Sequence, residues 1–301
     1  MKGNIVHASV ATRLVAALAL PGLLACLYLF AIRPSQLRWG ATALEVSRSM
    51  PGDDLVHSPS LCATRAITID RRSEEIWSWL AQMGYGRAGF YGYDLIENIG
   101  SDTGMRSVES ILPQFQHPKP GDALPISAVA SMVFGSIQPG SYLVWRGGTT
   151  PSDGSIVWAL YPVDNRHTRL VSRIRFHYHW TKPPLLFLDL FTEFGDHVAV
   201  AKILLGIKAR VEKRPSEPLL DEAAEIMVCV LALAELIAAM LFIFRWHRWG
   251  RAWFLAFTSG LLLLFVLYVR APTWIGAASG CGIFAGMILS LRAGSGSSPE
   301  G

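Results

Sequence analysis

The chain has 301 residues, of which 51% are hydrophobic and 17% are charged, a balance that excludes an ordinary soluble protein of this length. The formal net charge is only +4. No block of lysine and arginine marks a nucleic-acid footprint, so we expect no nucleic-acid partner.

Four apolar stretches explain this composition, because each is close to the roughly 20 residues that cross a bilayer as a helix. They cover residues 14–32, 225–244, 252–269 and 274–291. The first stretch has no small-residue cleavage site before Arg33, so we expect an uncleaved anchor. The sequence therefore predicts a multi-pass integral membrane protein. We expect an anchor over 1–32, a soluble domain over 33–220, a three-helix membrane region over 221–292 and a disordered tail over 293–301.

The distribution of basic residues predicts the orientation. Lys2 and Arg13 precede the first apolar stretch, Arg292 follows the last, and the loop RWHRWGR at 245–251 lies on the same side of a four-span arrangement. The positive-inside rule makes that side cytoplasmic. The soluble domain is then expected outside the cytoplasm, although its own basic residues, which carry less weight in a long folded domain, lie on the other side.

Within the soluble domain, the stretch MGYGRAGFYGYD contains Gly84, Gly86 and Gly89 at the spacing of a dinucleotide-binding loop. That motif is significant only when a strand precedes it and a helix follows. The preceding residues RRSEEIWSWLAQM have helical apolar spacing with an acidic first turn, so they predict a helix instead. We therefore interpret the glycines as a turn and expect no cofactor.

The remaining elements follow in chain order. Residues 62–70 predict a strand, a helix follows to Met83, and short helices are expected within 93–99 and 107–115. Strands at hairpin spacing are predicted at 131–137, 141–147, 155–163 and 167–180, as an antiparallel meander. After Pro183 and Pro184, a long helix is predicted to about Arg214. Its apolar stripe consists of Phe187, Phe191, Phe194, Val198, Ala201 and Leu205.

Three stretches resemble the START-like helix-grip superfamily, also called SRPBCC or polyketide cyclase/dehydrase-like. They are RAITIDRRSEEIWSWLAQMGYGRAGFYGYDLIEN, PKPGD and FGDHVAVAKILLGIKARVE, and the resemblance covers about residues 60 to 214. It implies an α+β fold in which an antiparallel sheet wraps a long C-terminal helix and leaves a cavity for apolar ligands. Here that fold would be flanked by transmembrane helices. The superfamily has no common catalytic signature, so no catalytic residue is transferred.

Two periodicities indicate which residues would line the cavity. Period two places Phe176 and Tyr178 on the inner face of the last strand, and helical spacing places Phe191, Phe194 and Val198 on one stripe. We expect the rim of the pocket to include Trp77, Tyr91, Tyr93, Asp94 and Glu97. Periodicity does not distinguish a filled core from a cavity; the resemblance favours a cavity.

The stretch RIRFHYHW invites two other interpretations. His177 and His179 would share one strand face, as metal ligands do, but Arg173 and Arg175 share that face and repel a cation. The aromatic residues take the opposite face, so they are not placed to stack on bases beside the arginines. We therefore expect neither a metal nor a nucleic-acid site, and we interpret the basic face as a polar outer surface.

Asp94, Glu97 and Asn98 lie three and four residues apart, which suits either general acid/base chemistry or a solvated helix face. Our leading hypothesis is a membrane-anchored protein that binds a lipid or hydrophobic small molecule, without cofactor, metal or catalysis. One alternative is a cyclase or hydratase using Asp94 or Glu97, and another is a regulatory or structural membrane module. Glu235, within the second apolar stretch, is interpreted as a hydrogen-bonding residue between helices.

Overall fold

The computed structural model describes residues 23, 26–147, 154–177, 186–215, 218–220, 222–223, 225–227, 229–230, 282 and 285, without the side chains of 186–188, 190 and 191. The chain divides into two units, residues 31–217 and the combination of 1–30 with 218–301. Among the described residues, we find no helix with the length and apolar character needed to cross a membrane. The four apolar stretches, and Glu235 with them, lie for the most part outside these residues.

The unit of residues 31–217 is an α+β structure around one antiparallel sheet with the strand order β1-β6-β5-β4-β3-β2. Its strands are β1 (Leu61–Ile69), β2 (Ala123–Pro125), β3 (Ser131–Gln138), β4 (Tyr142–Gly147), β5 (Gly154–Pro162) and β6 (Thr168–Phe176). Its helical elements are α2 (Arg33–Gln36), α3 (Ala43–Ser47), α4 (Ser73–Gln82), α5 (Asp94–Glu97), η2 (Pro113–Phe115) and α6 (Leu186–Val211), and the π-helical η1 (Tyr28–Ile32) precedes them.

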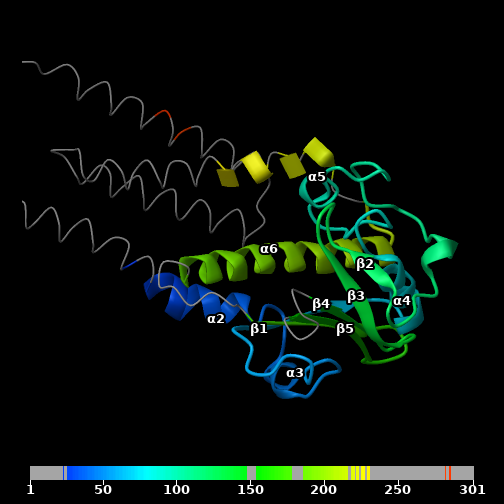
Figure 1. Ribbon diagram of the computed structural model, residues 1–301, viewed down its shortest axis with the longest axis horizontal. Helices are drawn as coiled ribbons and strands as arrows, with labels where there is room; N and C mark the ends of the chain where they lie inside the picture. The colour runs from blue at the N-terminus through cyan, green and yellow to red at the C-terminus, as the bar shows by residue number, and fades with distance from the viewer. Residues whose placement is uncertain are drawn as a thin grey trace, which may run out of the picture. The chain divides into compact units, whose positions relative to one another are not determined.

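The predicted meander is confirmed, because β3, β4, β5 and β6 pair consecutively. β1 then pairs with β6 from Leu61 opposite Phe176 to Ile69 opposite Thr168. The long helix α6 lies along one face of the sheet, and α4 packs against both α6 and β5 (Figure 1). This arrangement of one antiparallel sheet against one long C-terminal helix confirms the α+β class and is consistent with a helix-grip fold.

The predicted helix at 107–115 is wrong except for the 3-10 turn η2. The backbone N–H of Val108 donates to the carbonyl of Ala88 at 3.0 Å, which ties this segment to a distant loop. Leu112 is extended, as expected for a residue that precedes a proline. Tertiary hydrogen bonds and Pro113 therefore outweigh the local helical pattern.

The buried stripe of α6 also differs from the predicted one. Val200, Leu204, Ile207 and Val211 are buried against the sheet at intervals of four, three and four, whereas Phe194, Val198 and Leu205 are only half-buried. Toward the start of the helix the same stripe continues with Glu193 and His197, both nearly inaccessible to solvent. Because these two residues are polar, hydrophobic spacing alone shifted the predicted stripe by one or two positions.

Residues 37–57, which we call the strap, run around the edge of the sheet. The N–H groups of Thr64 and Ala66 in β1 donate to the carbonyls of Leu37 (2.9 Å) and Trp39 (3.0 Å). At Gly40, where φ is +70°, a β-carbon would stand 2.1 Å from the carbonyl oxygen of Ala66. Glycine is therefore required where the strap turns past β1.

The strap then covers the outer face of the sheet around Arg173, so the prediction of a solvated outer face on β6 is wrong there, whereas His177, just after the strand, is exposed. Met50 of the strap packs with Ala66, Val144, Val157, Ala159 and Val171 in a second apolar cluster. Figure 1 shows α3 and α6 on opposite sides of the sheet. The sheet is consequently buried on both faces.

Arg173 holds the strap from within this second cluster, and only 3% of its surface is exposed. Its guanidinium donates to the Thr64 hydroxyl (2.9 Å) and the Asp53 carboxylate (2.7 Å). It also donates to the backbone carbonyls of Glu45, Val46 and Arg48 at 2.8, 2.9 and 2.8 Å. Arg169 adds two hydrogen bonds to the carboxylate of Glu45, each 2.8 Å long.

We expect Arg173→Leu to lower the free energy of unfolding by about 3 to 5 kcal/mol, because it removes the donor to the Thr64 hydroxyl and to three strap carbonyls together with the ion pair to Asp53. Arg166→Leu is the matched control, since its side chain is 76% exposed and its loss should change stability by less than about 0.5 kcal/mol. Urea unfolding followed by tryptophan fluorescence measures both. Equal effects of the two substitutions would contradict a structural role for Arg173.

The strap should also respond to acid through Glu45. Burial alone would raise the pKa of this carboxyl, but hydrogen bonds from Arg169 and Thr42 lower it below its usual value. A lowered pKa in the folded state gives stability that is present above the unfolded pKa of 4.5 and is lost as pH falls through the folded value. The unfolding temperature should therefore exceed that of Glu45→Gln near neutral pH, and this difference should shrink below about pH 4.5. A difference that stays constant from pH 7 to pH 3 would refute the assignment.

Candidate functional site

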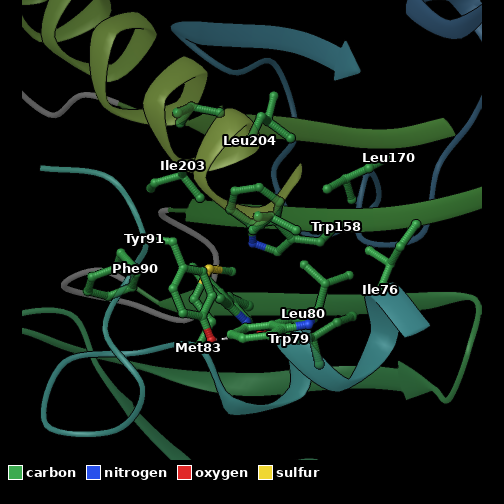
Figure 2. Packing of buried hydrophobic residues seen from close by; sticks show 14 of the residues in the cluster. Ile76, Trp79, Leu80, Met83, Phe90, Tyr91, Trp158, Leu170, Ile203 and Leu204 are labelled. Carbon is green, nitrogen blue, oxygen red and sulfur yellow. Dashed lines mark hydrogen bonds between the residues drawn. The ribbon is translucent and has the colours of Figure 1, made fainter. Parts of the chain in front are cut away.

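Large aromatic side chains pack between α4, α6 and the sheet. Trp158 lies with Ile203 and Leu204 of α6 on one side and Leu80 of α4 on the other (Figure 2). The ring centroids of Trp145 and Trp158 are 5.5 Å apart at an interplanar angle of 58°. Four elements and the glycine-rich turn thus contribute to one apolar interior, which the sequence predicted only in part.

The glycine-rich stretch is a turn, as expected. Gly84 and Gly89 exchange two backbone hydrogen bonds of 3.1 Å, and the φ angles of Gly84, Gly86 and Gly89 are +144°, +65° and +80°. The turn follows helix α4 and leads to Phe90 and Tyr91. Its role is to return the chain so that these two aromatic residues enter the interior.

Tyr91 is fixed at the floor of this interior. Its hydroxyl donates to the carbonyl of Trp79 and accepts from Gln82 Nε2, each at 3.1 Å, and Figure 2 shows it beside Trp79. The guanidinium carbon of Arg210 lies 4.8 Å from the centre of the ring. Burial raises the pKa of the phenol above its usual range, so the hydroxyl stays a neutral donor and is unsuited to act as a base.

Gln82 organises the loop after Tyr91, and sequence reasoning missed it. Its Oε1 accepts from the N–H of Leu112 (2.8 Å) and its Nε2 also donates to the carbonyl of Ser110 (3.1 Å). Gln82 is completely buried. In the sequence, Gln82 is a glutamine beside the apolar stripe of a helix. Glutamines at such positions usually face solvent, so there was little indication in the sequence that this one is buried.

Asp94 and Glu97 lie near the backbone of Tyr91 and Gly92, and both bind the polypeptide itself. Asp94 Oδ1 accepts from the Ser107 hydroxyl at 2.5 Å and from Asn98 Nδ2 at 3.2 Å. The Ser107 oxygen in turn accepts from the N–H of Tyr91 at 3.0 Å. Glu97 Oε2 accepts from the N–H of Gly92 at 3.1 Å. These contacts hold the loop over residues 84–107 in shape.

The other predicted lining residues are found in different surroundings. Trp77 is buried in the interior, and the ring of Tyr93 lies 4.9 Å from Lys202 Nζ. Phe176 is half-buried on the inner face of β6, against Gly154. Phe194 and Val198 are half-buried, as noted above. Tyr178 and the side chain of Phe191 lie outside the described residues.

A polar group lies at the start of α6, and the sequence analysis did not find it. Arg65 of β1, completely buried, donates to Asp196 Oδ2 (2.7 Å) and to the carbonyl of Gln36 (2.9 Å). Arg33 binds both carboxylate oxygens of Glu193, at 2.5 and 2.8 Å. Burial raises the pKa of Asp196, although Arg65 opposes this shift. Within the described residues we find no cluster of histidine, cysteine and carboxylate side chains that could hold a metal.

No protein-family model and no curated protein matches the chain. Several solved structures are similar to it. The Polyketide_cyc-like protein Cgl2372 from Corynebacterium glutamicum is 12% identical over 52% of this chain and 94% of that one, with a TM-score of 0.31. CalU16 from Micromonospora echinospora is 14% identical over 55% and 82%, with a TM-score of 0.32. MLL2253 from Mesorhizobium loti is 14% identical over 52% and 99%, also with a TM-score of 0.32.

The contact between α6 and Tyr91 makes a prediction. A β-carbon at Gly206 would stand 1.8 Å from the carbonyl oxygen of Tyr91, whereas at the exposed Gly195 no described atom lies within 4 Å. Gly206→Ala should therefore destabilise the protein by about 1 to 3 kcal/mol, since α6 must move away from the loop. Gly195→Ala should stabilise it by up to about 1 kcal/mol, because alanine favours a helix. Thermal unfolding of both variants tests the contact; a stabilised Gly206→Ala protein would show that the helix does not pack there.

Proposed function

We propose that the unit of residues 31–217 binds a lipid or another hydrophobic small molecule between α6 and the concave face of its sheet, without covalent chemistry. The observation that carries the proposal is the aromatic interior itself. Trp79, Phe90, Trp145 and Trp158 belong to one apolar cluster, which also contains Ile203 and Leu204 of α6. Ligand sites are typically concave, apolar and aromatic, with a few polar groups that orient the ligand.

The apolar stretches at 14–32, 225–244, 252–269 and 274–291 support a membrane location for this binding unit. They flank it in the sequence on both sides. In our proposal they anchor the unit at a membrane, on the extracytoplasmic side. A lipid or a lipid-soluble molecule would then be the ligand class present at the highest local concentration.

The contacts of Asp94 and Glu97 favour binding over catalysis. A general acid or base must reach the proton that it transfers. Asp94 is buried and already accepts hydrogen bonds from Ser107 and Asn98, and Glu97 accepts one from the backbone of Gly92. These interactions give both carboxylates a structural role in the loop beside the pocket.

Native mass spectrometry of the full chain, gently extracted and with lipid identification, tests the proposal. We expect the wild-type protein to carry a hydrophobic ligand. Val200→Trp places an indole on the buried stripe of α6 and should displace that ligand with little loss of thermal stability, because the new ring occupies the ligand's space. Val163→Trp, at a position 60% exposed, is the matched control and should retain the ligand.

A filled core gives the opposite result. An extra indole forced into close-packed side chains costs about 1 to 3 kcal/mol or more. A wild-type protein without bound ligand, combined with a Val200→Trp protein that is markedly destabilised relative to Val163→Trp, would therefore overturn the proposal.

A further inference from the structure

Four polar atoms in the interior of the sheet are buried without a hydrogen-bond partner among the described residues. They are Trp145 Nε1, Trp158 Nε1, Ser172 Oγ and one terminal guanidinium nitrogen, Nη2, of Arg65. None of the four residues exposes more than 2% of its surface. Buried polar groups almost always have a partner, and each one left unpaired costs about 1 to 3 kcal/mol. Their concentration in one region therefore indicates that a binding partner belongs there.

The four atoms belong to consecutive strands and form a row. Trp158 of β5 lies directly opposite Ser172 of β6, and Ser172 lies directly opposite Arg65 of β1. Trp145 of β4 is diagonal to Trp158, which pairs with Leu143. With neighbouring strands about 4.8 Å apart, the row extends over about 14 Å.

All four side chains are on the face toward α6. Trp145 and Trp158 belong to the interior cluster that includes Leu204 and Ile207 of α6. Arg65 binds Asp196 of α6. Ser172 alternates with Leu170 and Ile174, which belong to the same cluster. The row thus faces the space in which we place the ligand.

The chemistry of the row selects oxygen atoms. Indole and guanidinium nitrogens only donate hydrogen bonds, and the serine hydroxyl donates or accepts. The complement of such a row is a set of acceptors. Asp196 lies 2.7 Å from Arg65 and balances its charge, so a neutral oxygen suffices. The nearby Tyr91 hydroxyl and Gln82 amide are already bonded within the protein.

We propose that the ligand is a neutral, largely apolar molecule with carbonyl or hydroxyl oxygens, and that it lies across β4, β5, β6 and β1 with these oxygens on the row. This inference rests on the proposed function and narrows its ligand class. A pure hydrocarbon would leave all four groups unpaired. The same row gives the ligand one orientation, because its oxygens must meet the sheet and its apolar side must meet α6.

Two probes of nearly equal shape test the inference. In 2-acetylnaphthalene a carbonyl stands where 2-ethylnaphthalene has a methylene. Equilibrium dialysis of each probe against the full chain in lipid nanodiscs, with empty nanodiscs to correct for partitioning, gives the two affinities. We expect the ketone to bind at least about fivefold more tightly, the factor for one net hydrogen bond.

Trp145→Phe and Trp158→Phe keep an aromatic ring but remove the donor. At least one of them should reduce the preference for the ketone to nearly one. Trp39→Phe is the matched control: Trp39 belongs to the strap, packs against the same cluster while only partly buried, and its indole nitrogen is not one of the buried unpaired atoms. It should retain the preference. Should a variant fail to fold, the indole N–H signals of the unaltered protein provide a second measurement, because the ketone should shift two of them and the hydrocarbon should not.

The possible results separate this inference from the proposed function. Equal binding of both probes would overturn the oxygen preference and leave the hydrophobic site standing, as would a preference unchanged in both tryptophan variants. If water molecules alone bind the four atoms of the row, neither probe contacts the donors, and the two probes should likewise bind equally. Binding of neither probe, together with no ligand in the purified protein, would overturn both.

Discussion

Burial of Arg173 on the outer face of the sheet is the interaction on which the arrangement of the domain depends. A guanidinium that is 3% exposed is tolerated only when its donors and its charge are matched. Thr64, Asp53 and three carbonyls of the strap supply that match. If the strap detached from the sheet, the Arg173 guanidinium would lose its partners or become exposed. The strap therefore stays in place, and both faces of the sheet stay covered.

On the inner face of the sheet, by contrast, several buried polar groups have no partner within the part of the protein that the structure describes. There the side chains of Gln82, Asp94 and Ser107, which shape the loop over residues 84–107, have hydrogen-bond partners within the protein. The four polar atoms of the row from Trp145 to Arg65 have none among the described residues. The contrast is informative because a fold that satisfies the polar groups of an irregular loop has little reason to leave four groups of regular strands unpaired. Such exceptions to internal consistency are expected where a protein binds something.

Much of the scaffold was predictable from local pattern. Period two placed Leu170 and Ile174 inside and Arg173 outside, and the boundaries of β1, α4 and α6 were close to those observed. What surrounds Arg173 was not predictable, because its partners in the strap lie about 120 residues away in the sequence. The same holds for Ser107, which meets Asp94 only through the fold of the loop.

The candidate site was predictable in composition but not in detail. Trp77 and Tyr91 were expected at the rim of a pocket, and both are buried in the interior cluster. Arg65 could have been identified from the sequence, because the alternation of β1 places it on the same inner face as Ala63 and Ile67. The buried stripe of α6 was mispredicted because it includes the polar residues Glu193 and His197, and a search for apolar spacing omits buried polar residues. Pairing of polar groups across distant segments is the information that local periodicity lacks.

The strap also affects whether copies of the protein can associate through the edges of their sheets. An open edge strand presents unpaired N–H and C=O groups that recruit strands of other chains. On the edge strand β1, the N–H groups of Thr64 and Ala66 already donate to the carbonyls of Leu37 and Trp39. At the other edge, β2 is only three residues long. Both ends of the sheet are therefore poor templates for intermolecular pairing. A sheet whose two edges are protected in this way has little tendency to pair with the sheets of neighbouring copies of the protein.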